Sequence, residues 1–138
     1  TPVKPLQKLA LKIIDHWELG YGSQYNVTRK DALALARISD NLDATIIDID
    51  KETGQKPMIV VTSARDTGTP RTSFVALQDM LQTSTQPFLV VFGTGWGLTE
   101  TIISQADYVL EAVEGGSDYN HLSVRSAAAI VLDRLLGR

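Results

Sequence analysis

The sequence contains no cysteine and only two histidines, His16 and His121. The absence of cysteine excludes a disulfide framework, a thiolate zinc site and a cysteine nucleophile. Two histidines leave little material for a histidine-rich metal site. We therefore predict that the protein holds no metal.

Long apolar runs are also absent. The longest fall far short of the roughly 20 residues that a membrane-spanning helix needs. Residues 1–8 are polar and mildly basic, unlike the start of a secretory signal peptide. These features predict no membrane partner and a cytoplasmic location.

The composition is that of an ordinary folded protein. The chain has 138 residues, of which 43% are hydrophobic and 21% are charged. A chain of this length is enough for one domain and hardly for two, so we predict a single domain over residues 1–138. A disordered or low-complexity chain is excluded by the same numbers.

The net charge of −3 is unevenly distributed. Residues 1–37 hold six basic and three acidic residues, whereas the remainder of the chain is acidic. Lys4, Lys8 and Lys12 form a row with i, i+4 spacing, which is either a solvated helix face or a face turned toward RNA. A nucleic-acid partner could meet only a local basic face, because the chain as a whole is acidic.

Hydrophobic spacing predicts helices that alternate with short apolar strands in the second half of the chain. Strands are predicted over residues 58–61, 88–92 and 107–110, and helices over residues 5–18, 73–82, 99–104 and 122–136. Residues 41–52 fit either a strand, because they are rich in β-branched residues, or a helix, which their apolar spacing favours. A further short helix is expected to be capped by Asn26 or Thr28 and to run to about residue 36. Residues 66–71 are predicted to form a loop.

The strands are apolar on both sides, which indicates a parallel sheet covered by helices on both faces. Each predicted strand is followed by a polar or glycine-rich segment, at residues 62–64, 93–97 and 111–120. In parallel sheets, ligands bind beyond the carboxyl ends of the strands. We therefore expect these three segments to meet at a binding site.

Gly93, Gly95 and Gly97 alternate directly after a strand. The spacing is not that of a dinucleotide-binding loop, and no lysine follows as in a phosphate-binding P-loop. The loop is either a tight turn without a ligand or a backbone cradle for a mostly uncharged nucleoside. Trp96, within the same loop, is either a stacking surface for that ligand or a lid over the core.

The segment that opens the last predicted helix is also polar. Asn120 is a candidate N-cap, and His121 is either a polar residue at the helix start or part of the site. Residues 127–129 are alanines, so one side of this helix has little bulk. That side suits either tight helix–sheet packing or the close approach of another backbone.

Two runs of sequence carry a likeness to a known family. They are Phe-Leu-Val-Val-Phe-Gly-Thr-Gly-Trp-Gly-Leu at residues 88–98 and Ser-Asp-Tyr-Asn-His-Leu-Ser-Val-Arg-Ser-Ala-Ala-Ala-Ile at residues 117–130. Together they resemble the SPOUT superfamily of trefoil-knotted RNA methyltransferases that depend on S-adenosylmethionine (SAM). The subgroup related to the tRNA guanine-N1 methyltransferase is the most similar.

The resemblance implies an α/β fold in which a parallel sheet is covered by helices and the chain forms a deep C-terminal trefoil knot over about residues 58–138. It implies methyl transfer from SAM to RNA, with tRNA as the expected kind, by a homodimer. Family members usually begin with a strand–helix–strand segment that we expect this chain to lack. A non-catalytic knotted module that binds SAM or RNA and assists a partner methyltransferase is the alternative.

The resemblance also assigns site residues by position. It implies a SAM pocket formed by Thr62, Ser63, Ala64, Phe92, Gly93, Thr94, Gly95, Trp96, Gly97, Leu98, Leu110, Glu111, Ala112, Asn120, His121, Leu122 and Ser123.

A base or hydrogen-bond acceptor must lie near the atom that receives the methyl group. Asp118 is the first candidate, because it lies in the loop expected over the pocket, and His121 and Ser123 follow. The alternative for Asp118 is a turn or helix-capping aspartate.

Overall fold

A computed structural model describes residues 3–116 and 121–137 of the chain. Contacts within the chain divide it into two compact units, Thr1–Glu52 and Thr53–Arg138. Each unit is described by itself. The single domain expected over the whole chain stays a prediction.

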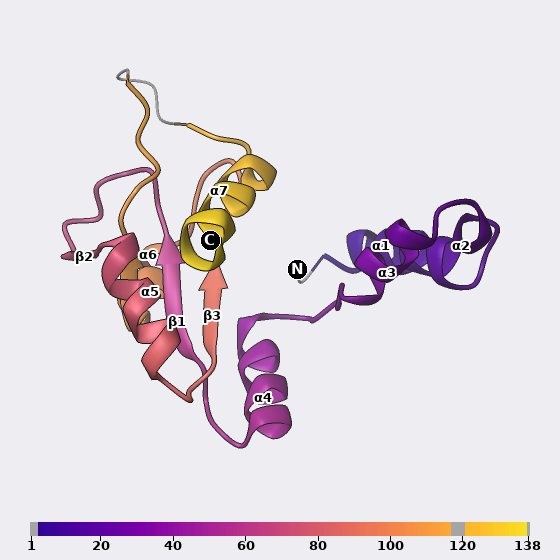
Figure 1. Ribbon diagram of the computed structural model, residues 1–138, viewed down its shortest axis with the longest axis horizontal. Coiled ribbons are helices and arrows are strands. Elements are labelled where there is room, and N and C mark those ends of the chain that lie inside the picture. The colour runs from indigo at the N-terminus through magenta and orange to yellow at the C-terminus, as the bar shows by residue number, and fades with distance from the viewer. Residues whose placement is uncertain (1–2, 117–120, 138) are drawn as a thin grey trace. The chain divides into compact units, whose positions relative to one another are not determined.

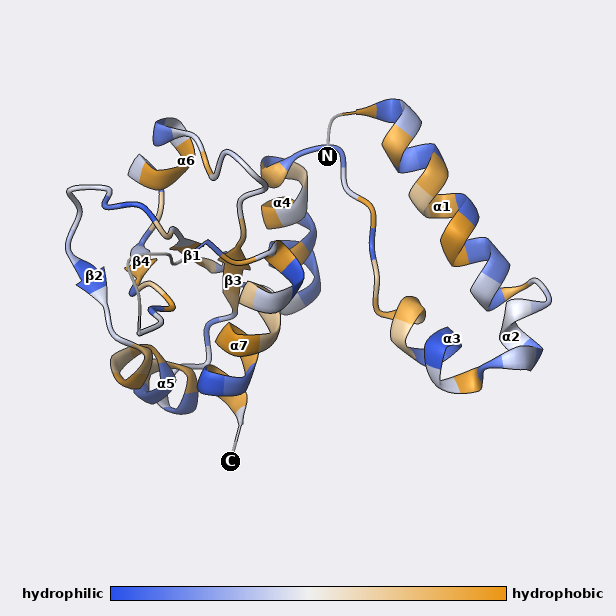
Figure 2. Cartoon of the chain, turned by 90° about the horizontal axis from the view of Figure 1, so that it is seen from above, coloured by the Kyte–Doolittle hydropathy of each residue, from blue (hydrophilic) through white to orange (hydrophobic). Residues whose placement is uncertain are grey.

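The first unit is helical. Its helices are α1 (Lys4–Glu18), α2 (Gly22–Tyr25), α3 (Val27–Ala34) and α4 (Leu42–Thr53), of which α4 ends one residue beyond the unit (Figure 1). Polar and apolar residues alternate along α1 in the manner of an amphipathic helix (Figure 2). The helices predicted from the sequence are confirmed, and α2 is an additional single turn.

Helix caps account for where two of these helices begin. The side chain of Asn26 accepts a hydrogen bond from the backbone amide of Arg29 at 3.0 Å, so Asn26 and not Thr28 caps α3. The side chain of Asn41 accepts in the same way from the amide of Ala44 at 2.8 Å, before α4. Each cap satisfies an amide that the first helical turn leaves without a helical partner.

A polar cluster ties the start of α1 to the segment before α4. Asp40 accepts hydrogen bonds from Lys4 Nζ at 2.6 Å and from Gln7 Nε2 at 2.9 Å. Gln7 is buried. The hydrogen bond from the Lys4 ammonium, followed by that from Gln7, holds the pKa of the Asp40 carboxyl below its ordinary value.

The second unit is a parallel sheet with helices on both faces, as the sequence predicts. Its strands are β1 (Met58–Thr62), β2 (Arg71–Thr72), β3 (Phe88–Val91) and β4 (Tyr108–Leu110), in the order β2-β4-β1-β3, and all neighbours are parallel. The helices are α5 (Phe74–Thr83), α6 (Glu100–Ser104) and α7 (Val124–Leu136). In Figures 1 and 2, α5 and α7 cover one face of the sheet and α6 covers the other.

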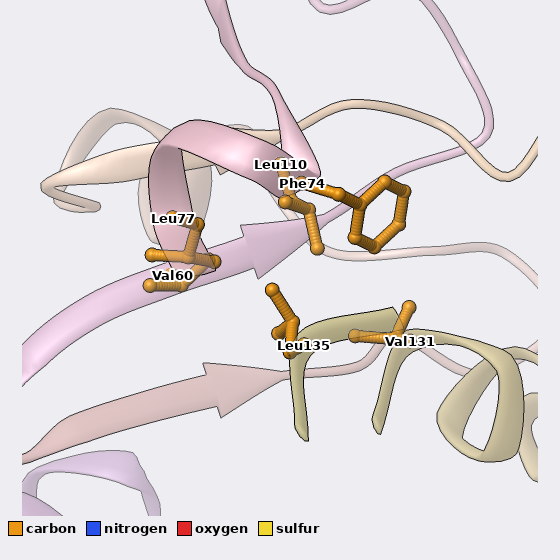
Figure 3. Packing of buried hydrophobic residues seen from close by; sticks show 6 residues of the cluster. All are labelled: Val60, Phe74, Leu77, Leu110, Val131 and Leu135. Carbon is orange, nitrogen blue, oxygen red and sulfur yellow. The ribbon is translucent and has the colours of Figure 1, made fainter. Parts of the chain in front are cut away.

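Two apolar clusters fill these layers. Figure 3 shows the larger one, between the sheet and helices α5 and α7, which contains Val60, Phe74, Leu77, Leu110, Val131 and Leu135. The smaller one faces α6 and contains Val61, Ile103 and Val109. Val60 and Val61 are both fully buried although they are consecutive, because side chains along a strand point to opposite faces. Because both faces of these strands are buried, their sequences are continuous runs of apolar residues.

The structure differs from the sequence predictions in this unit at three points. The loop predicted over residues 66–71 is present as far as residue 70, but Arg71 belongs to strand β2. The two residues of β2 are too few for a period-2 pattern to show. Helix α7 begins at Val124 rather than at residue 122. Its N-cap is Ser123, whose hydroxyl accepts from the Ser126 amide at 3.3 Å, and not Asn120.

Among the residues that the structure describes, no helix combines the length and the apolar character needed to cross a membrane. The trefoil knot expected over about residues 58–138 stays a prediction, and so does the expected lack of a first strand–helix–strand segment.

Candidate functional site

A cavity of about 610 Å³ lies in the second unit, where three strands end. Residues that follow β1, β3 and β4 line it, together with the first turns of α7. Small-molecule sites in proteins measure about 300–1,000 Å³, so this cavity has room for a nucleoside-sized ligand. The meeting of the three polar segments that the sequence predicts is therefore present in the structure.

The register of the sheet explains why the three loops meet. Val61 of β1 pairs with Val91 of β3, and Thr62 pairs with Leu110 of β4. The strands therefore end at the same level, and the chain leaves all three at one edge. A binding site at the carboxyl edge of a parallel sheet follows from this arrangement.

Most of the residues that the sequence assigned to the pocket line this cavity. They are Thr62, Ser63, Ala64, Phe92, Gly93, Thr94, Gly95, Trp96, Gly97, Glu111, Ala112, His121, Leu122 and Ser123.

Four other assigned residues are placed differently. Leu98 and Leu110 pack in the two apolar clusters and are not part of the lining. Leu110 is fully buried. Asp118 and Asn120 lie outside the residues that the structure describes.

The glycine loop closes on itself. The amide of Gly97 donates to the carbonyl oxygen of Thr94 at 2.6 Å, and Gly97 has a φ of 81°, which is in the left-handed region. A side chain at that φ would be strained, so glycine is required there. Gly95, at the middle of the loop, has no heavy atom within 4 Å of the place where a Cβ would stand. Its backbone is therefore open to a ligand.

Trp96 has an exposed fraction of 94%. A tryptophan that covered the core would be largely buried, so the interpretation as a lid is wrong. Trp96 belongs to the cavity lining, which leaves its ring available as a stacking surface.

Several polar side chains of the lining bond to the protein itself. The hydroxyl of Thr62 donates to the carbonyl oxygen of Val91 at 3.1 Å, which ties β1 to the end of β3. The Glu111 carboxylate accepts from the amide of Phe74 at 2.7 Å, at the start of α5. The Ser123 hydroxyl caps α7. These groups hold the walls in place, so the recognition of a ligand depends more on backbone groups and shape.

Five lining residues were not assigned from the sequence: Arg65, Val113, Val124, Ala127 and Val131. Arg65 follows the Thr62–Ala64 run directly, and its Nη2 lies 3.1 Å from the position of a Cβ on Gly97. The guanidinium of Arg65 therefore lies against the glycine loop. Of these five, only Ala127 belongs to a pattern noted in the sequence, the run of three alanines that leaves one side of the last helix with little bulk.

The described part of the chain contains no group of three or more His, Asp and Glu residues placed to hold a metal ion. Arg65, Glu111 and His121 are the charged or titratable side chains of the lining. The arrangement offers a glycine backbone, an exposed aromatic ring and one arginine around a small-molecule cavity.

Comparison with known proteins finds similarity over nearly the whole chain. Residues 1–137 match a family described as SAM-dependent RNA methyltransferase. The chain is 41% identical to a tRNA (guanine-N(1)-)-methyltransferase of Nitratidesulfovibrio vulgaris, and 39% identical to a protein of the same name from Oleidesulfovibrio alaskensis. These alignments cover 99% of this chain and 31% of each relative.

A third relative, an uncharacterized protein of Aquifex aeolicus, is 38% identical over 99% of this chain and 66% of its own length. The chain thus spans about a third of the length of the two relatives with an enzymatic name and about two thirds of the third.

Proposed function

The chain belongs to a family of SAM-dependent RNA methyltransferases, and we propose that the protein binds SAM in the cavity at the carboxyl edge of the sheet and methylates tRNA. The names of two relatives support tRNA as the substrate, with a guanine base as the first acceptor to test. Because the chain spans 31% of each of those relatives, their activity is carried over as part of this proposal.

The observation that carries the SAM site is the open backbone of Gly95 beside a cavity of about 610 Å³. A nucleoside that is read by backbone groups needs such close approach, which any larger side chain would block. Ala64, Phe92 and Leu122 add an apolar wall that suits an adenine ring. The residues present therefore fit the cofactor that the family name implies.

When bound, SAM supplies a methyl group on a positively charged sulfonium. The glycine loop would hold the nucleoside, and the walls would exclude water and fix the direction of approach. Arg65, at the glycine loop, is the cation with which the site would hold an RNA phosphate.

The acceptor atom loses a proton when it gains the methyl group, so the protein needs an acceptor for that proton. Asp118 is the proposed base, and His121 and Ser123 are the next candidates. His121 and Ser123 line the cavity. The Ser123 hydroxyl also caps α7, which gives it a structural role that a base would not need.

We also propose a homodimer in the cytoplasm, with α7 in the interface. Leu132 is 48% exposed and Leu136 is 68% exposed on this helix, although its other side packs in the core. Apolar side chains at this level of exposure on a core helix suit burial against a second subunit.

A second candidate function is a module that binds SAM or RNA and assists a separate methyltransferase. The observation that favours it is that the side chains of Thr62, Glu111 and Ser123 in the cavity lining bond to the protein itself and so serve to hold the walls.

Transfer of a radioactive methyl group from SAM to tRNA by the full-length protein tests the proposal. We expect incorporation into tRNA from a strain in which the gene is deleted, and none into tRNA from the parent strain. Tight binding of S-adenosylhomocysteine without any transfer, unless a second methyltransferase is added, would establish the module instead. No binding of either nucleoside would overturn the assignment of the cavity.

A further inference from the structure

Arg71, on the edge strand β2, makes hydrogen bonds with three backbone carbonyl groups. Its Nη1 donates to the carbonyl oxygens of Ser63 at 2.9 Å and of Leu110 at 3.3 Å. Its Nη2 donates to the carbonyl oxygen of Arg65 at 2.5 Å. The Arg71 side chain is half-buried and is not part of the cavity lining.

The three carbonyl groups belong to two different walls of the cavity. Ser63 and Arg65 are lining residues that follow β1. Leu110 ends β4, and the next residue, Glu111, is again a lining residue. A single guanidinium therefore joins the loop after β1 to the loop after β4, from outside the cavity.

The surrounding segment strengthens this connection. Thr72 accepts from the Glu111 amide at 2.9 Å through its carbonyl oxygen. The Phe74 amide donates to the Glu111 carboxylate at 2.7 Å. Thr72 of strand β2 thus fixes the backbone of Glu111, and the first residue of α5 fixes its side chain, while Arg71 holds the neighbouring loop.

The third wall is joined by another side chain. The Thr62 hydroxyl donates to the carbonyl oxygen of Val91, one residue before the Phe92 that enters the glycine loop. Arg71 and Thr62 together connect the ends of β4, β1 and β3 in that order. The spacing of all three walls therefore depends on side-chain hydrogen bonds beyond the strand ladder.

Only arginine suits the position of Arg71. Its planar guanidinium has five N–H donors in a rigid fork and stays charged, so it can bond to several carbonyl oxygens at fixed angles. A lysine ammonium is a single flexible point and cannot reproduce that fork. Without an arginine at position 71, the carbonyl oxygens of Ser63, Arg65 and Leu110 would lose the hydrogen bonds that its guanidinium donates.

We propose that Arg71 is a positioning residue of the SAM site, which sets the distance between the loops after β1 and β4 without touching the cofactor. The inference rests on the proposed function for the cavity. It assigns to Arg71 an effect on cofactor affinity that is separate from its effect on stability.

The test compares the affinity for S-adenosylhomocysteine with the melting temperature in the full-length protein. Calorimetric titration is done at a temperature where circular dichroism shows each variant to be fully folded. We expect Arg71→Met to raise the dissociation constant by about tenfold or more, because a small misplacement of binding groups has effects of that order. Hydrogen exchange should become faster at residues 62–66 and 110–113.

Gln86→Met is the matched control. The Gln86 Nε2 donates to the carbonyl oxygen of Lys56 at 2.8 Å, so it too ties neighbouring segments through a backbone carbonyl. This contact lies before β1 and β3, at the opposite edge of the sheet from the cavity. We expect Gln86→Met to lower the melting temperature and to leave the affinity unchanged.

If folded Arg71→Met binds S-adenosylhomocysteine within about twofold of the parent protein, the role of Arg71 is structural only and the proposal is overturned. Should Arg71→Met fail to fold, Arg71→Lys decides, because lysine keeps the charge and can reach one carbonyl. An affinity below that of the parent supports the proposal, and an equal affinity overturns it. Failure of the parent protein to bind would instead overturn the SAM site itself.

Discussion

A Cβ on Gly93 would lie 2.5 Å from the carbonyl carbon of Gly97, so the two ends of the glycine loop touch each other backbone to backbone. Real Cβ atoms do not approach a backbone carbon so closely. The contact shows that two glycines of this loop are needed for different reasons. Gly93 is needed for the loop to close, whereas Gly95 faces open space.

This difference predicts opposite behaviour for two variants. Gly95→Val should keep the melting temperature and lose binding of S-adenosylhomocysteine, because its side chain would occupy the place of a ligand. Gly93→Ala should destabilise the protein by about 1–3 kcal/mol, as overpacking does, since the loop must open to admit the methyl group. Thermal unfolding and calorimetric titration measure the two effects.

Gly116→Val is the control for the Gly95 variant. A Cβ at Gly116 also meets no heavy atom within 4 Å, but Gly116 does not line the cavity. It should leave affinity and stability unchanged. Normal affinity in folded Gly95→Val would contradict the placement of the ligand against the glycine loop.

Arg65 is expected to act on the RNA rather than on the cofactor. Arg65→Gln removes the cation that lies against Gly97 and keeps a polar side chain of similar length. The KM for tRNA should rise, and its dependence on salt should weaken, because one phosphate contact is lost. The affinity for S-adenosylhomocysteine should not change; a loss there would indicate that Arg65 holds the cofactor's carboxylate instead.

The proposed dimer predicts that charge on the exposed side of α7 will separate the subunits. Leu132→Glu and Leu136→Glu should each shift the protein toward monomer in sedimentation experiments, because a carboxylate is costly to bury at an interface. Leu35→Glu changes an apolar residue that is 84% exposed in the first unit and should have no effect. A parent protein that sediments as a monomer at micromolar concentration would argue against the dimer.

Asp118 is predicted to act in proton transfer. Asp118→Asn removes the basic oxygen and keeps the shape, so turnover should fall strongly while the affinity for S-adenosylhomocysteine changes little. If Asp118 is a turn or capping residue, turnover stays normal and stability falls by about 1 kcal/mol instead. His121→Gln would then be the next variant to assay.

The hydrogen bonds of Asp40 predict that the stability of the first unit falls at acid pH. Its pKa is lowered from the ordinary value of 3.8 by its hydrogen bonds to Lys4 and Gln7. A lowered pKa contributes stability that is fully present above the unfolded value and is lost as the pH falls through the folded pKa. The contribution is small, because the Asp40 side chain is 62% exposed and solvent screens the pair.

We therefore expect urea unfolding of Asp40→Asn to show a weaker loss of stability below about pH 4 than the parent protein. Asp31→Asn removes one carboxylate elsewhere in the same unit and is the control. An acid response of Asp40→Asn equal to that of the parent would contradict the contribution of the Lys4–Asp40 pair.

Local signals in the sequence account for most of the elements and for the position of the site. Strands β1, β3 and β4 are buried on both faces of the sheet. Such strands need apolar residues at consecutive positions, and the sequence shows these runs directly. The carboxyl ends of parallel strands lie at one edge of the sheet, so the sequence alone predicts that the three polar segments lie close together. The helix predicted over residues 73–82 agrees with α5 to within one residue at each end, and Ser73 is its N-cap rather than its first residue.

Other features are decided by contacts between segments distant in sequence. Strand β2 exists because Arg71 and Thr72 pair with Val109 and Leu110, which no local pattern encodes. Leu98 and Leu110 look like members of the pocket by position, yet they pack in the apolar clusters, since Leu98 follows the turn at Gly97 and Leu110 is still part of β4. Trp96 could be buried or exposed from its sequence context, and only the closed loop places it outside.

The sequence by itself determined which residues are apolar enough to form the sheet and which backbone is free to approach a ligand, because both depend on side-chain chemistry at single positions. The tertiary structure alone decided how far apart the walls of the site stand. That distance depends on hydrogen bonds from Arg71 and Thr62 to carbonyl groups 8, 39 and 29 residues away, and such bonds exist only once the strands have come together.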